Sequence, residues 1–133
     1  MIRTLLDTDT VIALLRGNPR ITERVRAHPT KSIGISMITV YELRVGVEKS
    51  REPEKNERFL GDALAPFAVI PFDEPASIQS AKIRSLLERR GQGIGPYDTL
   101  IAGHALSIHA ELISGNTGEF SRVPDLKLGN WLS

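Results

Sequence analysis

The stretch I-R-T-L-L-D-T-D-T at residues 2–10 decides the fold. Its apolar residues run directly into Asp7, which predicts a buried strand that ends on a carboxylate. Thr8 and Thr10 can cap the helix expected to follow. Ligands of open α/β sheets bind beyond the carboxyl ends of the strands, so Asp7 stands where a site would form. The alternative is that Asp7 or Asp9 only caps the helix.

Size and composition exclude several classes of protein. A chain of 133 residues fits one domain, residues 1–133. Its 17 Lys and Arg against 16 Asp and Glu give a net charge of +1, which does not by itself indicate a nucleic-acid binder. The chain contains no cysteine, which excludes disulfides and thiolate metal sites. No apolar run approaches the roughly 20 residues that span a bilayer, so we expect a cytoplasmic protein without membrane contact.

Segments with strand and helix patterns alternate along the whole chain. Strands are expected at residues 2–6, 31–36, 67–71, 111–114 and 126–128. Helices are expected at residues 11–16, 19–28, 37–49, 53–65, 76–90 and 97–110, and a loop at 115–119. This order predicts an α/β fold in three layers, with a central parallel sheet of four to five short strands flanked by helices.

The predicted sheet brings four acidic residues toward one edge. Asp7 follows the first strand, Glu42 lies early in the helix after the second, and Glu119 lies in the loop after the fourth. Asp98 joins them if its helix begins at that edge, as its Gly-Pro-Tyr entry indicates. The other acidic residues fall on outer helix faces beside Lys or Arg, where solvated surface is the expected state.

Clustered carboxylates repel one another unless a cation lies between them. An all-oxygen cluster suits a hard cation such as Mg²⁺ or Mn²⁺, which can lower the pKa of bound water and bind a phosphate. The expected chemistry is therefore phosphodiester hydrolysis. The alternative is that Glu42 is a surface residue and Asp98 only a helix cap.

Four blocks of sequence in register resemble a known family. The blocks are L-L-D-T-D at 5–9, S-x-I-T-x-x-E-L at 36–43 with G-x-E-K-S at 46–50, G-P-Y-D-x-x-I-A-G-H-A at 95–105, and G-N-T-x-E-F-x-R-V-P-x-L at 115–126. Together they resemble PIN-domain ribonucleases and, more narrowly, the VapC toxins of bacterial VapBC toxin–antitoxin pairs. The resemblance implies a metal-dependent endoribonuclease that halts translation and is inhibited by a VapB antitoxin. The G-P-Y-D block implies initiator tRNA, cut in the anticodon stem-loop, as the substrate.

The resemblance also assigns the site by position. Asp7, Glu42 and Asp98 match the three acids of the PIN site. Many PIN domains have Asp where this chain has Asn116, and Glu119 follows three residues later. We expect Asp7, Asp98 and Glu42 to hold the metal, with Asn116 as a further ligand and Glu119 beside it. In-line attack would then leave a 5′-phosphate and a 3′-hydroxyl.

Other residues are candidates for contacts with the substrate and with partners. Thr8 and Thr99 each adjoin an acid and can bind a phosphate or simply cap a helix. Arg44, Arg89, Arg90 and Arg122 are candidates to bind the RNA backbone, and for each the alternative is a solvated position on a helix face. An apolar groove between the helices at 37–49 and 53–65 can receive an antitoxin segment. A homodimer, and a higher assembly with the antitoxin, are expected from the resemblance alone.

Two rival functions belong to different classes. D-T-D-T-V at 7–11 also resembles the opening motif of haloacid-dehalogenase-like phosphohydrolases, in which Asp7 would be the nucleophile. That reaction needs a later Lys and a further acidic motif, and residues 115–120 supply only Asn116 and Glu119. The second rival is a non-catalytic RNA-binding module whose acids are helix caps.

Overall fold

A five-stranded parallel sheet forms the centre of the computed structural model, which describes residues 1–132. The strands lie in the order β3-β2-β1-β4-β5, with β1 in the middle. Every neighbouring pair is parallel. The strand bounds are β1 Thr4–Leu6, β2 Ile33–Ser36, β3 Ala68–Ile70, β4 Glu111–Ile113 and β5 Leu128–Gly129.

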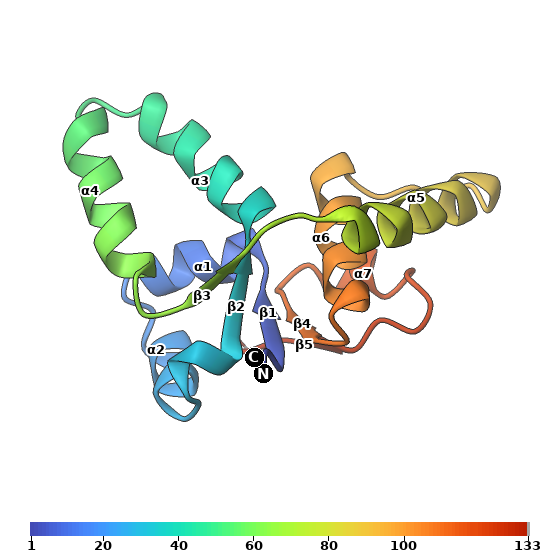
Figure 1. Ribbon diagram of the computed structural model, residues 1–133, viewed down its shortest axis with the longest axis horizontal. Coiled ribbons are helices and arrows are strands. Elements are labelled where there is room, and N and C mark those ends of the chain that lie inside the picture. The colour runs from blue at the N-terminus through green and yellow to red at the C-terminus, as the bar shows by residue number, and fades with distance from the viewer. Residues whose placement is uncertain (133) are drawn as a thin grey trace.

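Helices cover both faces of this sheet (Figure 1). Their bounds are α1 Thr8–Leu15, α2 Pro19–Arg26, α3 Met37–Glu48, α4 Pro53–Leu64, α5 Glu74–Arg89, α6 Pro96–Ser107 and α7 Thr117–Phe120, with a short 3₁₀ helix at Thr30–Ser32. Helices α1 to α4 pack on one face and α5 to α7 on the other. The predicted three-layer α/β fold is confirmed.

The alternation of side chains along β1 explains the two cores. Leu6 points into the core beneath α1 to α4, whereas Leu5 points into the core beneath α5 to α7. Ile113 and Leu112 on β4 divide between the two faces in the same way. All four side chains are fully buried, which matches the continuous apolar run that a central parallel strand requires.

Most predicted elements lie within a few residues of their observed positions, and three differ in an informative way. The first helix begins at Thr8 rather than at residue 11, because Asp7 caps it in place of the threonines. A single helical turn, α7, spans Thr117–Phe120 and so overlaps residues 115–119, which were expected to form a loop. The last strand is Leu128–Gly129 rather than 126–128, since Ser114 of the β4 end pairs with Gly129.

The order of the strands creates a switch point between β1 and β4. From β1 the chain passes to β2 and β3 on one side, and then crosses to β4 and β5 on the other. Ligands of open α/β sheets bind at such a point, beyond the carboxyl ends of the strands. Asp7 follows β1 and Ser114 follows β4, so both lie at this position.

The packing of α5 against α6 fixes the helix that carries Asp98. A Cβ at Gly103 of α6 would lie 2.0 Å from Ser80 Oγ and 2.6 Å from the Ser80 backbone nitrogen. The absence of a side chain at Gly103 therefore permits this close approach of the two helices. Within residues 1–132, none of the helices combines the length and apolar character that a membrane crossing requires.

Candidate functional site

Asp7 is held from two sides at the carboxyl end of β1. Its Oδ1 accepts a hydrogen bond of 2.8 Å from the backbone N–H of Thr8, so it is the N-cap of α1. Its Oδ2 accepts one of 2.7 Å from the hydroxyl of Ser114. The side chain is only 4% exposed. Capping and a position in the site are therefore compatible, although the sequence presented them as alternatives.

Burial raises the pKa of Asp7 from 3.8 to about 7. The charges of Asp9 and Asp98 contribute to this rise, whereas the hydrogen bonds from Ser114 and Thr8 partly offset it. None of the ion pairs formed within residues 1–132 involves Asp7 or Asp98. The protein thus buries a carboxylate beside other carboxylates without supplying a basic partner.

Asp98 and Glu119 approach each other across the switch point. Asn116 bridges them, since its amide nitrogen lies 2.5 Å from Glu119 Oε2 and 3.4 Å from Asp98 Oδ2. The backbone N–H of Gly95 donates to Glu119 Oε1 at 3.3 Å. The side-chain amide hydrogens of Asn116 are thus directed at two carboxylates, which leaves its carbonyl oxygen as the atom to face a ligand.

The pKa values of Asp98 and Glu119 are shifted in opposite directions. Burial raises the pKa of Asp98 from 3.8 to about 6, and the charges of Glu119, Glu42 and Asp9 add to the rise. The hydrogen bond from Asn116 lowers the pKa of Glu119, and the nearby charge of Arg122 contributes to the decrease. Of the two carboxyl groups, Glu119 is therefore the stronger acid and Asp98 the weaker one.

Glu42 reaches the same edge from the second turn of α3. Its Oε1 accepts a hydrogen bond of 2.8 Å from the hydroxyl of Thr8, which lies 3.2 Å from the hydroxyl of Thr39. The charge of Glu42 acts on Asp98, so the two lie within electrostatic range. Thr8 therefore orients a carboxylate of the cluster, and its predicted contact with substrate stays a prediction.

Sequence reasoning missed two residues that organise this edge. Ser114 is fully buried, donates to Asp7 and accepts the backbone N–H of Asn116 at 2.9 Å. Asp9 accepts the backbone N–H of Gly115 at 3.0 Å, which ties α1 to the segment after β4. Two features of the sequence could have indicated these residues. Ser114 comes directly after a predicted strand, and Asp9 lies two residues after Asp7.

The remaining candidates lie in different surroundings. The hydroxyl of Thr99 donates to the Gly95 carbonyl at 3.0 Å, within the first turn of α6. The guanidinium of Arg44 pairs with Glu57 of α4 at 3.0 Å, not with the cluster. Arg122 donates to the Gly93 carbonyl at 3.1 Å and lies close enough to Glu119 to act on its charge. Arg122 therefore lies near the carboxylates, whereas Arg44 does not.

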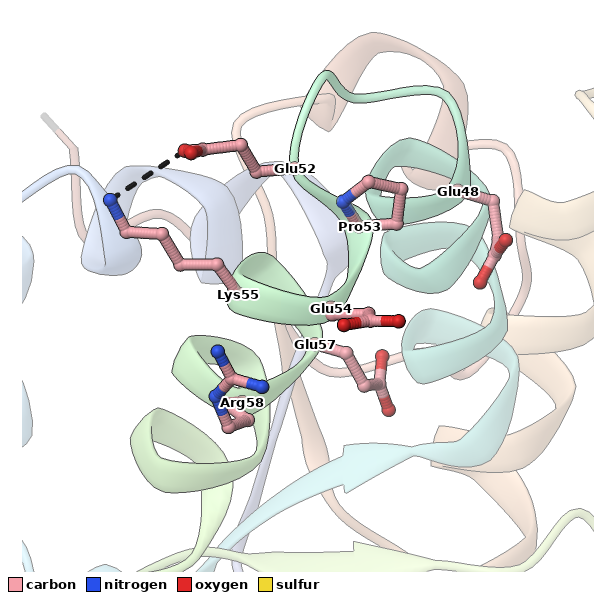
Figure 2. Close-up of a pocket in the computed structure, with 7 residues that line it drawn as sticks. All are labelled: Glu48, Glu52, Pro53, Glu54, Lys55, Glu57 and Arg58. Atoms are coloured by element: carbon pink, nitrogen blue, oxygen red, sulfur yellow. Dashed lines mark ion pairs between the residues drawn. The ribbon is translucent and has the colours of Figure 1, made fainter.

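A second group of carboxylates lies at the turn between α3 and α4 (Figure 2). It comprises Glu48, Glu52, Glu54 and Glu57, with Lys55 and Arg58 among them. Lys55 pairs with Glu52 at 3.6 Å, as the dashed line in Figure 2 marks. These side chains lie on the surface beside basic residues. The α3–α4 turn is therefore as rich in acidic residues as the switch point, but its carboxylates are not buried.

The donor set at the switch point suits a hard cation, although the side chains are not gathered around one. Asp7, Glu42, Asp98 and Glu119 offer only oxygen atoms, which Mg²⁺ and Mn²⁺ prefer. Burial is the main cause of the raised pKa values of Asp7 and Asp98, and the negative charges of neighbouring carboxylates add a repulsion of the kind that a bound cation relieves. Within residues 1–132, however, no group of three or more Asp, Glu and His side chains is arranged so that it could hold a metal ion.

A protein-family model and several curated proteins match this chain over nearly its whole length. The PIN domain family model matches residues 4–126. The chain belongs to the PIN-domain family. Among curated relatives, the tRNA(fMet)-specific endonuclease VapC of Salmonella typhimurium is 37% identical over 132 residues, covering 98% of this chain and 99% of that protein. Ribonuclease VapC2 of Haemophilus influenzae is 35% identical over 133 residues, covering 99% and 100%. Within the PIN family, the chain is thus one of the VapC proteins.

Solved structures place the PIN fold of this chain among toxin–antitoxin complexes. The DNA-bound VapBC complex from Salmonella typhimurium contains a chain that matches with a TM-score of 0.93 at 37% identity, covering 98% of this chain and 99% of that one. VapBC-1 from nontypeable Haemophilus influenzae matches with a TM-score of 0.90 at 33% identity, covering 100% of both chains. These PIN-domain relatives favour the ribonuclease interpretation over the phosphohydrolase.

Proposed function

We propose that this chain is the ribonuclease toxin of a VapBC toxin–antitoxin pair and that it hydrolyses RNA with the help of a divalent cation. The observation that carries the proposal is that Asn116 bridges Asp98 and Glu119 within electrostatic range of Asp7, at the β1–β4 switch point of a PIN domain. The homologues named as ribonucleases support the reaction class.

The proposed cofactor is Mg²⁺ or Mn²⁺, with Asp7 and Asp98 as its first ligands. Asp7 is buried and Asp98 is half-buried, and the charge of Asp98 contributes to the raised pKa of Asp7. Glu42 and the carbonyl oxygen of Asn116 are the further donors in this proposal. A bound cation would lower the pKa of a water molecule and offset negative charge on the reacting phosphate.

The chain's own residues orient the reacting groups. Ser114 and the Thr8 N–H hold the Asp7 carboxylate in one orientation, which limits reorganisation during the reaction. Glu119 is partly exposed and is oriented by Asn116 and the Gly95 N–H, so it is the candidate to accept a proton from an attacking water. In-line attack by water on the phosphodiester leaves a 5′-phosphate and a 3′-hydroxyl.

Initiator tRNA is the proposed substrate, cut in its anticodon stem-loop in the cytoplasm. The support is the printed name of the Salmonella relative, a tRNA(fMet)-specific endonuclease, which aligns over nearly the whole chain. Arg122 is the proposed phosphate contact, because it lies beside Glu119.

The proposed partner is a VapB antitoxin that docks on the face formed by α1, α3 and α4. An apolar groove is present there, between the helices where the sequence predicted it, and it is lined by residues that include Leu15, Val47 and Phe59. The relatives whose structures are titled VapBC support a partner of this kind. A homodimer, with a higher assembly once the antitoxin binds, is part of the same proposal.

Brief expression in cells followed by mapping of RNA ends tests this function. Wild-type protein should produce new 5′-phosphate ends in the initiator tRNA anticodon stem-loop, and co-expressed antitoxin should suppress them. Asp7→Asn should produce none. Asp62→Asn makes the same chemical change at an exposed position of α4 and is the matched control.

The outcomes separate the rival functions. RNA bound but never cut would indicate the non-catalytic module. An acyl-phosphate trapped on Asp7 would indicate the phosphohydrolase. Equal cleavage by the Asp7→Asn and Asp62→Asn proteins would refute the proposed site.

A further inference from the structure

Two exposed tyrosines bridge the helices that carry Glu42 and Asp98. Tyr41 precedes Glu42 on α3, and Tyr97 precedes Asp98 on α6. Their ring centroids lie 5.6 Å apart with planes tilted by 56°, and their hydroxyl oxygens are 3.3 Å apart. The charge of Glu42 acts on Tyr97, which places the aromatic pair beside the carboxylates.

The exposure of these rings is unusual for their size and position. Tyr41 is 48% exposed and Tyr97 is 43% exposed, and each hydroxyl has the other as a hydrogen-bonding partner. Large aromatic side chains dominate binding energetics when their rings become covered. The pair thus offers open ring surface at the rim of the site rather than a contribution to the core.

The charge of the site creates a need for such a contact. Several carboxylates lie near the switch point, and a cation bound there would offset their charge only at the phosphate that it contacts, while the neighbouring phosphates are still repelled. The net charge of the chain is only +1, so general attraction for a polyanion is weak. Stacking of a base on an aromatic ring does not depend on attraction to the phosphate charge, and every nucleobase can stack in this way.

We propose that Tyr41 and Tyr97 form a stacking platform for an unpaired nucleobase next to the phosphate that is cut. Proteins that read RNA by sequence target loops whose unstacked bases rest on aromatic side chains. The platform would select single-stranded over paired RNA at the cut. This inference rests on the proposed ribonuclease function and assigns part of its substrate specificity to these two residues.

The experiment measures RNA affinity in the Asp7→Asn background, where cleavage does not interfere. The probe is an initiator tRNA anticodon stem-loop carrying 2-aminopurine at one loop position at a time. We expect fluorescence quenching at one loop position, and Tyr41→Ala or Tyr97→Ala should weaken binding by roughly tenfold or more. Tyr41→Phe and Tyr97→Phe keep the rings and should retain the quenching and most of the affinity.

Two further measurements separate stacking from other roles. In proteins with Asp7 intact, the alanine variants should raise KM with little change in kcat, and the steepness of the salt dependence should stay the same. Ile78→Ala removes a similarly exposed apolar side chain from α5 and should bind RNA as the parent does. Both tyrosines are on the surface, so circular dichroism should show the variants folded.

Three results would overturn the inference. One is equal RNA affinity for the alanine and phenylalanine variants. Another is a change of oligomeric state in the alanine variants at unchanged affinity per protomer, which would assign the pair to contact between copies of the chain. The third is the absence of RNA binding by any form of the protein, and that result would remove the proposed function as well. Tyrosine-dependent binding without cleavage by wild-type protein would contradict the proposed function alone.

Discussion

The switch point and the α3–α4 turn contain the same kind of side chain in opposite surroundings. At the turn, Glu52 and Glu57 lie in open solvent and pair with Lys55 and Arg44. At the switch point, Asp7 is buried among other carboxylates and has a hydroxyl rather than a cation as its partner. The comparison teaches that burial without a counter-charge, not the number of acidic residues, distinguishes the candidate site.

The largest expected difference between the switch point and the α3–α4 turn is in RNA cleavage. Asp7→Asn keeps the size of the side chain and removes its charge, so RNA cleavage should fall by at least about 100-fold, as for the loss of a preorganised electrostatic group. Glu54→Gln at the α3–α4 turn should cleave RNA at the wild-type rate. Initial rates on one RNA substrate measure both, and similar losses in the two variants would erase the distinction.

The pH dependence of stability should also differ between the regions. Because the folded-state pKa of Asp7 is raised to about 7, its stabilising contribution is complete below pH 3.8 and is lost as the pH rises through 7. Without divalent metal at pH 8, Asp7→Asn should therefore be more stable than wild type, by on the order of 2–4 kcal/mol. Urea unfolding at pH 4 and pH 8 measures this difference, and identical pH profiles for the two proteins would contradict it.

Metal affinity should rise with pH, whereas the stabilising contribution of Asp7 falls with pH, because both depend on protonation of the same carboxyl group. A cation competes with protons for Asp7 and Asp98, whose pKa values are about 7 and about 6. Below pH 7 the affinity for Mn²⁺ should fall roughly tenfold for each pH unit while one carboxylate is protonated. Isothermal titration at pH 8, 7 and 6 measures the trend. An affinity that does not change with pH would show that the cation binds elsewhere.

Ser114 takes the place at Asp7 that a basic side chain takes at the surface. Its hydroxyl donates to Asp7, whereas Glu52 and Glu57 pair with Lys55 and Arg44. Ser114→Ala removes a buried hydrogen bond to a carboxylate and should destabilise the protein by about 1–3 kcal/mol. It should also raise the pKa of Asp7 further and shift metal binding to higher pH. Ser121→Ala removes an exposed hydroxyl that bonds to the Gly118 carbonyl and is the matched control. Equal stability of the two variants would show that Asp7 does not depend on this contact.

The smallest effect is expected at the turn itself. The Arg44–Glu57 pair is exposed, and such pairs contribute about 1 kcal/mol or less. A double-mutant cycle with Arg44→Ala and Glu57→Ala should give a coupling energy in that range, together with unchanged RNA cleavage. Loss of cleavage in Arg44→Ala alone would instead support the predicted contact of Arg44 with RNA.

The sequence was sufficient for the architecture because the relevant signals are local. Buried apolar runs, capping residues and prolines at helix starts mark the alternation of strands and helices, and parallel strands then bring Asp7 and the residues after β4 to one edge. The pairing of Asp98 with Glu119 through Asn116 agrees with that reasoning.

What the sequence could not supply depends on contacts between distant segments. The direction of the Ser114 hydroxyl toward Asp7 joins residues 107 positions apart. The contact of Arg44 with α4 rather than with the carboxylates depends on how two helices pack. Neither leaves a pattern in the local sequence, and the same holds for the meeting of Tyr41 with Tyr97.

Metal-dependent cleavage by purified protein tests the central claim most directly. Initiator tRNA is incubated with wild-type protein in EDTA and then with Mg²⁺ restored, and Asp7→Asn protein is treated in parallel. We predict no cleavage in EDTA, recovery with Mg²⁺ for wild type, and none for Asp7→Asn. Cleavage by the wild-type protein that persists in EDTA, or full activity of Asp7→Asn with Mg²⁺, would contradict the account.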